Sequence, residues 1–346
     1  MRATKTALRL AVAALAWGWL AAPVLADDPP AAPTTPPSCQ GLDLFGPSAV
    51  RPEALAQAEA QRAGQLDNSQ GLLWRIEKAG RPPSYLFGTV HSTDDRAIAL
   101  AKEAATHIQG VNVVATELGG PLDKFAMAEM GAKTMVRALA KEGDTLAVIG
   151  APDDLALVEK YLATRGVDAS LAHHLKPWFL AILAGTPSCE MRRQQFGLPF
   201  VDDLIARSGK DLGVKVVGLE TVDEQMDILA SIEPSLAATI LLSSVRRPGF
   251  DENFYSTMLD YYAKKDAGEI LPLLDASGLL TPQESKAEDE FTALLLGGRN
   301  EIMVDRLAPL LDGGPVFVAV GALHLIGKGG LVELLRARGY TVTNLW

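Results

Sequence analysis

Two histidines of this chain share a local sequence setting whose residue types could serve hydrolytic chemistry. Residues 85–91 and 316–324 each run an apolar stretch into Gly-x-x-His, ending at His91 and His324. The whole chain has only five histidines in 346 residues. A buried strand delivers its last residue to the carboxyl edge of a sheet, and a glycine there lets the backbone turn so that a histidine faces a crevice. His91 and His324 are therefore candidate partners at one site.

Two carboxylates follow apolar runs in the same way. Residues 111–117 end in Glu117, and residues 214–220 end in Glu220. If these strands are parallel, all four side chains meet at one edge of the sheet. Two histidines and a carboxylate can hold a divalent metal such as Mn, Co or Zn, which polarises a carbonyl and activates water. The sequence therefore predicts a site at this edge made of His91, His324 and one or both of Glu117 and Glu220.

Each candidate also has a structural interpretation. A single histidine near a strand end is usually bonded to backbone, and Glu220 precedes a capping threonine, where it would favour the helix dipole. Arg299 could pair with Glu220 or stabilise an oxyanion in catalysis, although a surface helix start explains it almost as well. Asn300, Gly88 and Gly321 are the candidate substrate contacts.

Several other kinds of site are excluded by motif and charge. The chain has no Gly-x-Ser-x-Gly elbow, no His-Glu-x-x-His helix and no Gly-x-Gly-x-x-Gly turn, and residues 321–329 depart from a phosphate loop in spacing and in the final residue. The formal net charge is −10. This charge argues against a nucleic-acid partner or an anionic membrane surface.

The elements that must position the site read as an α/β fold. Strands are predicted at 72–77, 84–90, 111–118, 214–219, 316–320 and 340–345, mostly separated by helices. Gly80-Arg-Pro-Pro83 joins the first two as an antiparallel hairpin at one side. After residue 90, a helix is predicted to begin near the capping residues Ser92 and Thr93. These patterns indicate a mostly parallel mixed sheet with an N-terminal antiparallel hairpin and a large helical insertion at about 233–311.

The first residues predict export. Residues 1–26 have a basic start, a short apolar stretch and a small-residue pattern for cleavage after Ala26, so they read as a signal peptide. Cleavage would remove Arg2, Lys5 and Arg9, which changes the formal charge from −10 to −13. Residues 27–40 read as a disordered Pro-rich leader and 41–346 as the folded domain. We expect a periplasmic or secreted protein without a membrane anchor after cleavage.

Cys39 and Cys189 are the only cysteines. Export permits a disulfide between them, and the chain-entropy model values such a bridge at roughly 4–5 kcal/mol. The alternative is two unpaired thiols.

Taken together, these motifs resemble the TraB/GumN family, which is related to the TIKI proteases. The resemblance rests on Leu73-Trp-Arg-Ile76, the two Gly-x-x-His segments, the Glu117 strand end, Gly218-Leu-Glu-Thr-x-x-Glu-Gln225 and Arg299-Asn300. It implies a fold like the erythromycin-esterase and ChaN-like group, with the paired motifs and acidic residues facing one cleft. It also implies metal-dependent peptidase activity at His91, Glu117 and His324, with Arg299 as a further polar member.

Three functions follow as hypotheses. The first is an exported metal-dependent hydrolase that cleaves a peptide bond, with a peptide or another small molecule as substrate. In this hypothesis His91, Glu117 and His324 hold the metal. Glu220 is a general base or orients the ligands, and Arg299 stabilises developing negative charge. The second is a metal-independent esterase in which a histidine is the general base. The third is a protein that binds a peptide, pheromone or polysaccharide fragment without turnover. The sequence leaves substrate, metal identity and oligomeric state open.

Overall fold

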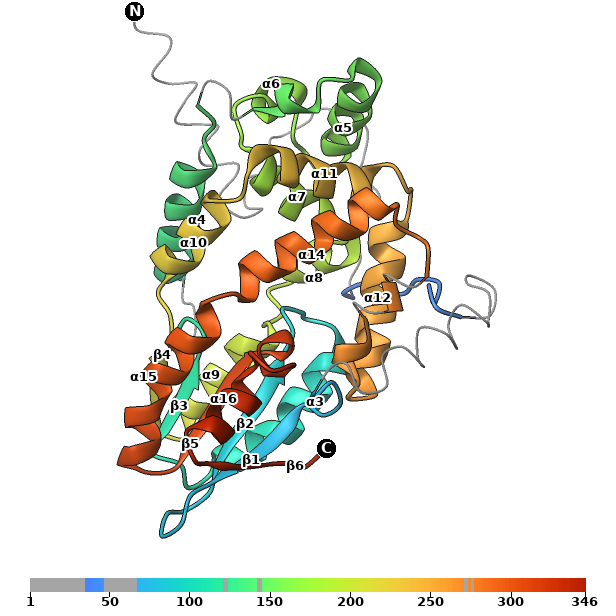
Figure 1. Cartoon of the computed structure of the whole chain (residues 1–346). Coiled ribbons are helices and arrows are strands. Elements are labelled where there is room, and N and C mark those ends of the chain that lie inside the picture. The colour runs from blue at the N-terminus through green and yellow to red at the C-terminus, as the bar shows by residue number, and fades with distance from the viewer. Residues whose placement is uncertain (1–34, 47–66, 121–123, 142–144, 271–272, 275–276) are drawn as a thin grey trace, which may run out of the picture.

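A six-stranded mixed sheet forms the lower part of the molecule (Figure 1). The computed structural model describes residues 35–46, 67–120, 124–141, 145–270, 273–274 and 277–346. The strand order is β4-β3-β5-β2-β1-β6. The strands lie where the sequence predicts them: β1 Leu73–Glu77, β2 Ser84–Thr89, β3 Val113–Thr116, β4 Lys215–Gly218, β5 Val316–Gly321 and β6 Thr341–Asn344. The predicted signal peptide lies outside the described residues.

The four strands that carry the candidate site residues are parallel. β3 pairs with both β4 and β5, and β5 pairs with β2, all in parallel register. β1 and β2 form the predicted antiparallel hairpin. The hairpin lies at one side of the sheet, as predicted. The edge strand on that side is β6, which pairs with the outer side of β1 and places Trp74 opposite Asn344. A sequence pattern identifies a terminal strand but not its partner, which here lies about 270 residues away.

Strand alternation builds one core on each face of the sheet. Phe87, Phe317 and Ala319 pack with helices α3 (Asp95–Ala105) and α9 (Val201–Asp211). On the opposite face, Leu86, Val318 and Val320 pack with α15 (Arg299–Gly313) and α16 (Leu331–Ala337). Successive strand residues point to opposite faces, so strands covered on both sides read as continuous apolar runs. This packing fixes the carboxyl edge where the candidate residues lie.

The remaining helices connect β3 to β4 and β4 to β5. In chain order they are α4 Lys124–Ala138, α5 Pro152–Thr164, α6 Ala169–Ala172, α7 Pro177–Gly185, α8 Ser188–Gln195, α10 Val222–Ala230, α11 Pro234–Val245, α12 Phe250–Ala263 and α14 Pro282–Leu296. Short 3-10 turns lie at Thr106–Ile108, Leu146–Ile149, Ala267–Glu269 and Ala322–Leu325.

Both connections contribute to one helical layer above the sheet (Figure 1). Its core joins apolar residues of α4, α5 and α7 to those of α11 and α14. In Figure 1 the layer accordingly mixes green helices from the first connection with yellow and orange helices from the second. The predicted insertion at 233–311 therefore accounts for only part of this layer.

Helix starts carry the expected capping chemistry. Asp94, rather than Ser92 or Thr93, is the N-cap of α3, and its side chain accepts a hydrogen bond from the Arg96 N–H. Thr221 and Glu224 form a complete capping box at α10. Within the described ranges, no single helix has the length and apolar composition to cross a membrane; only the bent pair α10 and α11 passes that test jointly.

The two cysteines are bridged, as predicted. Cys39 and Cys189 form a disulfide with their Cα atoms 5.3 Å apart. Cys39 is buried, and the Cys39 carbonyl accepts a hydrogen bond from Arg96. The bridge and this contact thus attach the C-terminal end of the predicted leader, residues 27–40, to the folded domain.

Candidate active site

The two Gly-x-x-His segments lie side by side. β2 and β5 pair in parallel with Gly88 opposite Val320 and Thr89 opposite Gly321. Gly88 has to be small here, because a Cβ on it would lie 3.0 Å from the Ala322 Cα. The parallel register therefore brings both histidine-bearing turns to the same edge of the sheet.

The two strand-end glutamates meet at that edge around one arginine. Backbone pairing continues past β3 and β4, with the Glu220 N–H donating to the Glu117 carbonyl at 2.7 Å. Arg299, at the start of α15, donates from Nε and Nη2 to the Glu220 carboxylate at 2.7 and 2.6 Å, and from Nη2 to Glu117 Oε2 at 3.0 Å. All three side chains are buried. Two carboxylates and one guanidinium leave one negative charge uncompensated, which favours a cation at this position.

Gln225 completes the hold on the two carboxylates. Its Nε2 donates to Glu117 Oε2 at 2.9 Å and to Glu220 Oε2 at 3.0 Å. Gln225 belongs to α10, whose capping box starts immediately after Glu220. The sequence assigned it no role, because a glutamine in a first helical turn is an ordinary helix former.

Asn300 fixes the protonation of His324. The Asn300 amide donates to the Gly329 carbonyl at 2.8 Å, so its oxygen accepts the Nδ1–H of His324 at 2.6 Å. With the proton on Nδ1, the Nε2 lone pair is free. Burial lowers the pKa of His324 to about 4, so the ring is neutral at neutral pH. The contacts of Asn300 are thus with the protein, whereas the sequence suggested a substrate contact.

The free nitrogen of His324 lies near Glu117. His324 Nε2 and Glu117 Oε1 are 3.8 Å apart, and Oε1 also accepts the Gly321 N–H at 2.7 Å. Burial raises the pKa of Glu117, but the charge of His91 foremost, together with Arg299 and the Gly321 N–H, lowers it to about 2. A charged carboxylate and a neutral imidazole therefore face each other.

His91 is held by a different carboxylate. Its Nδ1 lies 3.0 Å from Asp202 Oδ2, and Thr89 donates its hydroxyl to Asp202 Oδ1 at 2.7 Å. The His91 side chain is 71% exposed. The charge of Asp202 foremost raises the pKa of His91 to about 9, so the ring is protonated at neutral pH. Asp202 was not singled out from the sequence, where it reads as an acidic residue in the first turn of α9.

The remaining glycine and histidine predictions are placed as follows. The Gly88 carbonyl accepts the Tyr262 hydroxyl at 2.7 Å, and the Gly321 N–H is bound by Glu117. The other three histidines were left outside the site by the sequence. His107 contacts the Tyr85 ring, His173 contacts Glu159, and His174 contacts the Ser170 carbonyl.

The donor set suits a divalent metal in part. Imidazole nitrogen and carboxylate oxygen bind such ions at about 2.1 Å, so a separation of 3.8 Å is close to that of two ligands of one ion. His91 is directed at Asp202 and would have to lose a proton to act as the third ligand. Among the described residues, no three His, Cys, Asp or Glu side chains are grouped to hold a metal. Of the three predicted ligands, His324 and Glu117 thus lie close together, and His91 contacts Asp202 instead.

The whole site lies in a region that matches a known protein family. Residues 72–344 match the model of the TraB/PrgY/gumN family, a range that contains every residue of the site described above. The chain belongs to the TraB/PrgY/gumN family.

The chain is also similar to proteins named as metalloproteases. This TraB/PrgY/gumN chain is 24% identical over 316 residues to Metalloprotease TIKI1 of Xenopus tropicalis, covering 78% of the chain and 60% of the relative. It is 24% identical over 319 residues to Metalloprotease TIKI2 of Danio rerio, with the same coverage. A Metalloprotease TIKI homolog of Nematostella vectensis is 27% identical over 167 residues, which cover 42% of the chain and 36% of the relative. The match thus spans about 60% of the length of the first two relatives, and no solved structure matches.

Proposed function

We propose that this chain is an exported metal-dependent hydrolase that cleaves peptide bonds. The observation that carries the proposal is the pair formed by the fixed Nε2 of His324 and Glu117 Oε1, 3.8 Å apart in a buried cluster with one uncompensated negative charge. The names of the TIKI relatives support the reaction class. The family match covers all the residues assigned to the site.

His324 and Glu117 would hold the divalent ion, Mn, Co or Zn, with His91 as the third candidate ligand. A bound ion of this kind polarises the scissile carbonyl and lowers the pKa of water. Asn300 keeps the His324 proton on Nδ1, and such partners of metal ligands commonly strengthen binding.

The remaining polar residues position these ligands. Arg299 and Gln225 hold the Glu117 carboxylate, and most of the Arg299 donors are already used. We therefore assign Arg299 and Glu220 to positioning Glu117 rather than to direct stabilisation of an oxyanion or to general base catalysis. If His324 and Glu117 hold the ion without His91, the exposed and protonated His91 can instead donate a proton to the leaving group.

The test is metal analysis combined with turnover of a fluorogenic peptide library. Mature protein dialysed against Mn, Co or Zn should retain about one ion per chain, and a chelator should abolish cleavage. His324→Ala should lose both the ion and the activity. The matched control is His174→Ala, since His174 is exposed and, among the described residues, its side chain hydrogen-bonds only to the Ser170 carbonyl. Protein that cleaves no peptide and retains no ion would contradict the proposal.

One observation favours a second candidate, metal-independent ester hydrolysis. Thr89, Asp202 and His91 form a hydrogen-bonded chain that ends at the exposed His91 ring, an arrangement typical of an acid–base histidine. Ester cleavage that survives the chelator and is lost in Asp202→Asn would select this function. Ligand capture without turnover of peptide or ester would select the binding function instead.

Export rests on the predicted signal peptide and on the disulfide, which persists in oxidising compartments. N-terminal sequencing of protein from the periplasm or medium should give Asp27 as the first residue. Full-length protein confined to the cytoplasm would contradict export.

A further inference from the structure

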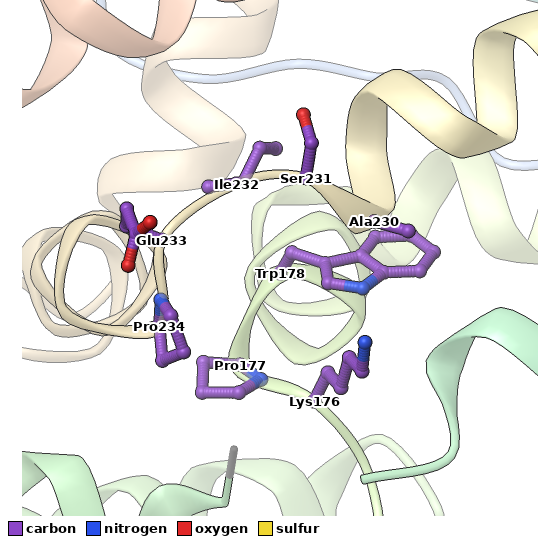
Figure 2. Close-up of a pocket in the computed structure, with 8 residues that line it drawn as sticks. All are labelled: Lys176, Pro177, Trp178, Ala230, Ser231, Ile232, Glu233 and Pro234. Carbon is purple, nitrogen blue, oxygen red and sulfur yellow. The ribbon is translucent and has the colours of Figure 1, made fainter. Parts of the chain in front are cut away.

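A pocket in the helical layer lies apart from the candidate active site. It measures about 200 Å³ and is found where α7, α10 and α11 come together (Figure 2). Within the described ranges, none of its eight wall residues hydrogen-bonds to His91, Glu117, Glu220, Arg299 or His324. The side chains of α8, by contrast, bond to the turn that follows His91.

This turn is buried, although the histidine before it is not. The His91 side chain is 71% exposed, whereas Ser92, Thr93 and Asp94 are each at most 5% exposed. Connecting segments normally run over the surface, because their backbone polar groups need water or another partner. Here the partners are protein groups: the Val201 N–H donates to the Ser92 carbonyl at 3.1 Å, for example. The position of His91 is therefore set by contacts from inside the protein.

Helix α8 supplies the side chains that hold the turn. Its buried residues are Cys189, Glu190 and Arg193. A helix normally buries an apolar face, and buried ionisable side chains are costly unless they are paired. Glu190 and Arg193 are each 2% exposed, so their bonds to the turn account for their burial.

Glu190 holds the two residues that follow His91. The Thr93 N–H donates to its carboxylate at 3.1 Å, and the Tyr255 hydroxyl lies 2.7 Å from Glu190 Oε2 and 2.7 Å from Ser92 Oγ. An ionised carboxylate can only accept, so Tyr255 gives its one proton to Glu190 and the Ser92 hydroxyl donates to Tyr255. A backbone donor and a side chain of the turn thus both depend on Glu190.

Arg193 holds the same turn and joins it to the leader. Its Nε donates to Thr93 Oγ1 at 3.1 Å, and its Nη2 donates to the Thr93 carbonyl at 2.8 Å. Its Nη1 donates to the Pro37 carbonyl at 2.9 Å. Cys39 follows two residues later and is bridged to Cys189 on α8. The leader, α8 and the turn are therefore linked as one unit.

We propose that Glu190 and Arg193 are positioning residues for His91, and that the disulfide fixes the helix that carries them. Both act through Thr93, whose N–H is held by Glu190 and whose carbonyl is held by Arg193. A displacement of about 1 Å in an active site can lower a rate by about a hundredfold, so such a hold suits a catalytic turn. The effect on turnover rests on the proposed hydrolase, whereas the effect on the place of His91 does not.

NMR spectra of the histidine rings test the proposal without any need for turnover. Mature disulfide-bonded protein labelled isotopically at histidine should give five ring signals, and His91→Gln identifies that of His91. Glu190→Ala, which removes the acceptor for Thr93, should move or broaden the His91 signal. The signals of the three histidines outside the site, His107, His173 and His174, should stay in place.

Glu190→Gln separates position from charge. Both variants remove the charge, but the glutamine oxygen still accepts the Thr93 N–H and its amide can donate to Tyr255. Glu190→Gln should therefore leave the His91 signal close to its original place. In peptide cleavage, Glu190→Ala should lower kcat by about tenfold or more with KM little changed. Absence of cleavage by the unchanged protein would contradict the proposed hydrolase, and the NMR comparison would still decide the role of Glu190.

Cys39→Ala combined with Cys189→Ala removes the bridge and keeps Glu190. It should also move the His91 signal, and it keeps the test decisive if Glu190→Ala does not fold.

The matched control is Glu284→Ala on α14. Glu284 is 3% exposed, accepts the Thr281 N–H at 2.8 Å and pairs with Arg247, so it resembles Glu190 in burial and in having a backbone donor. Its loss should leave the His91 signal in place. An unmoved His91 signal in Glu190→Ala or in the bridge-free protein would overturn the proposal. Equal movement in Glu284→Ala, or in Glu190→Gln, would overturn it as well.

Discussion

Replacement of Arg299 by alanine should be among the most destabilising single changes at the sheet edge. Arg299 donates three hydrogen bonds of 2.6–3.0 Å to the Glu117 and Glu220 carboxylates and a further one to the Leu295 carbonyl. All three charged side chains are buried. Without the guanidinium, two buried carboxylates would repel each other with only Gln225 between them. Removing one partner of a buried ion pair typically costs about 3–5 kcal/mol, and that loss is expected here.

The assay is urea unfolding of the disulfide-bonded protein, followed by far-UV circular dichroism and tryptophan fluorescence. The matched control is Arg306→Ala, seven residues later on α15. Arg306 pairs with Glu224 at 2.6 Å and, like Arg299, also donates to one backbone carbonyl, that of Leu219. That pair is about 40% exposed on both sides, so its loss should cost less than about 1 kcal/mol. The contrast between the variants isolates burial, because both lose an arginine from the same helix.

A second change separates charge from packing. In Arg299→Ala combined with Glu220→Gln, one of the two carboxylates becomes neutral, so part of the lost free energy of unfolding should return. Equal free energies of unfolding for Arg299→Ala and Arg306→Ala would refute the reasoning, because the buried cluster would then be no more important than a surface pair.

Three further predictions concern stability. Burial raises the pKa of Glu284, but its hydrogen bonds to Arg247 and to the helix start prevail and hold the pKa at about 2, against an ordinary value of 4.5. Between these pH values the unfolded chain binds more protons than the folded chain, so acidification from pH 5 to 2.5 should lower the thermal midpoint. The midpoint should fall by less in Glu284→Gln. Reduction of the Cys39–Cys189 bridge, which closes a loop of 150 residues, should lower the free energy of unfolding by up to about 5 kcal/mol, and an unchanged urea midpoint after confirmed reduction would contradict this. Thr221→Ala should remove the capping box of α10 and cost about 1 kcal/mol in urea unfolding, whereas Thr221→Ser should cost little.

The strands were predictable because each is a short apolar run bounded by turn or capping residues. Burial on both faces produces such runs directly, as in β5, where five successive residues are buried. The sequence also indicated that four strand ends share an edge, since strands separated by helices favour parallel pairing. The position of β6 outside the hairpin was not predictable, because its partner is set by packing between distant segments.

Only some of the predicted site residues lie together in the structure, because contacts between distant segments decide the partner of each side chain. Glu117, Glu220, Arg299 and His324 converge because strand ends and the start of α15 deliver them to one place. His91 was expected to face Glu117, but its Nδ1 hydrogen-bonds to Asp202, which lies 111 residues later in the chain. The type and spacing of residues indicate which side chains can reach a sheet edge. They do not specify which of two nearby carboxylates the His91 ring will contact.

The pairing of β6 with β1 has a consequence for synthesis of the chain. β1 is complete by Glu77, but its outer row of N–H and C=O groups finds its partner only when Thr341–Asn344 have left the ribosome. Until then the hairpin presents an open strand that could pair with another nascent chain. A protein built this way benefits from being kept unfolded until its last strand is made.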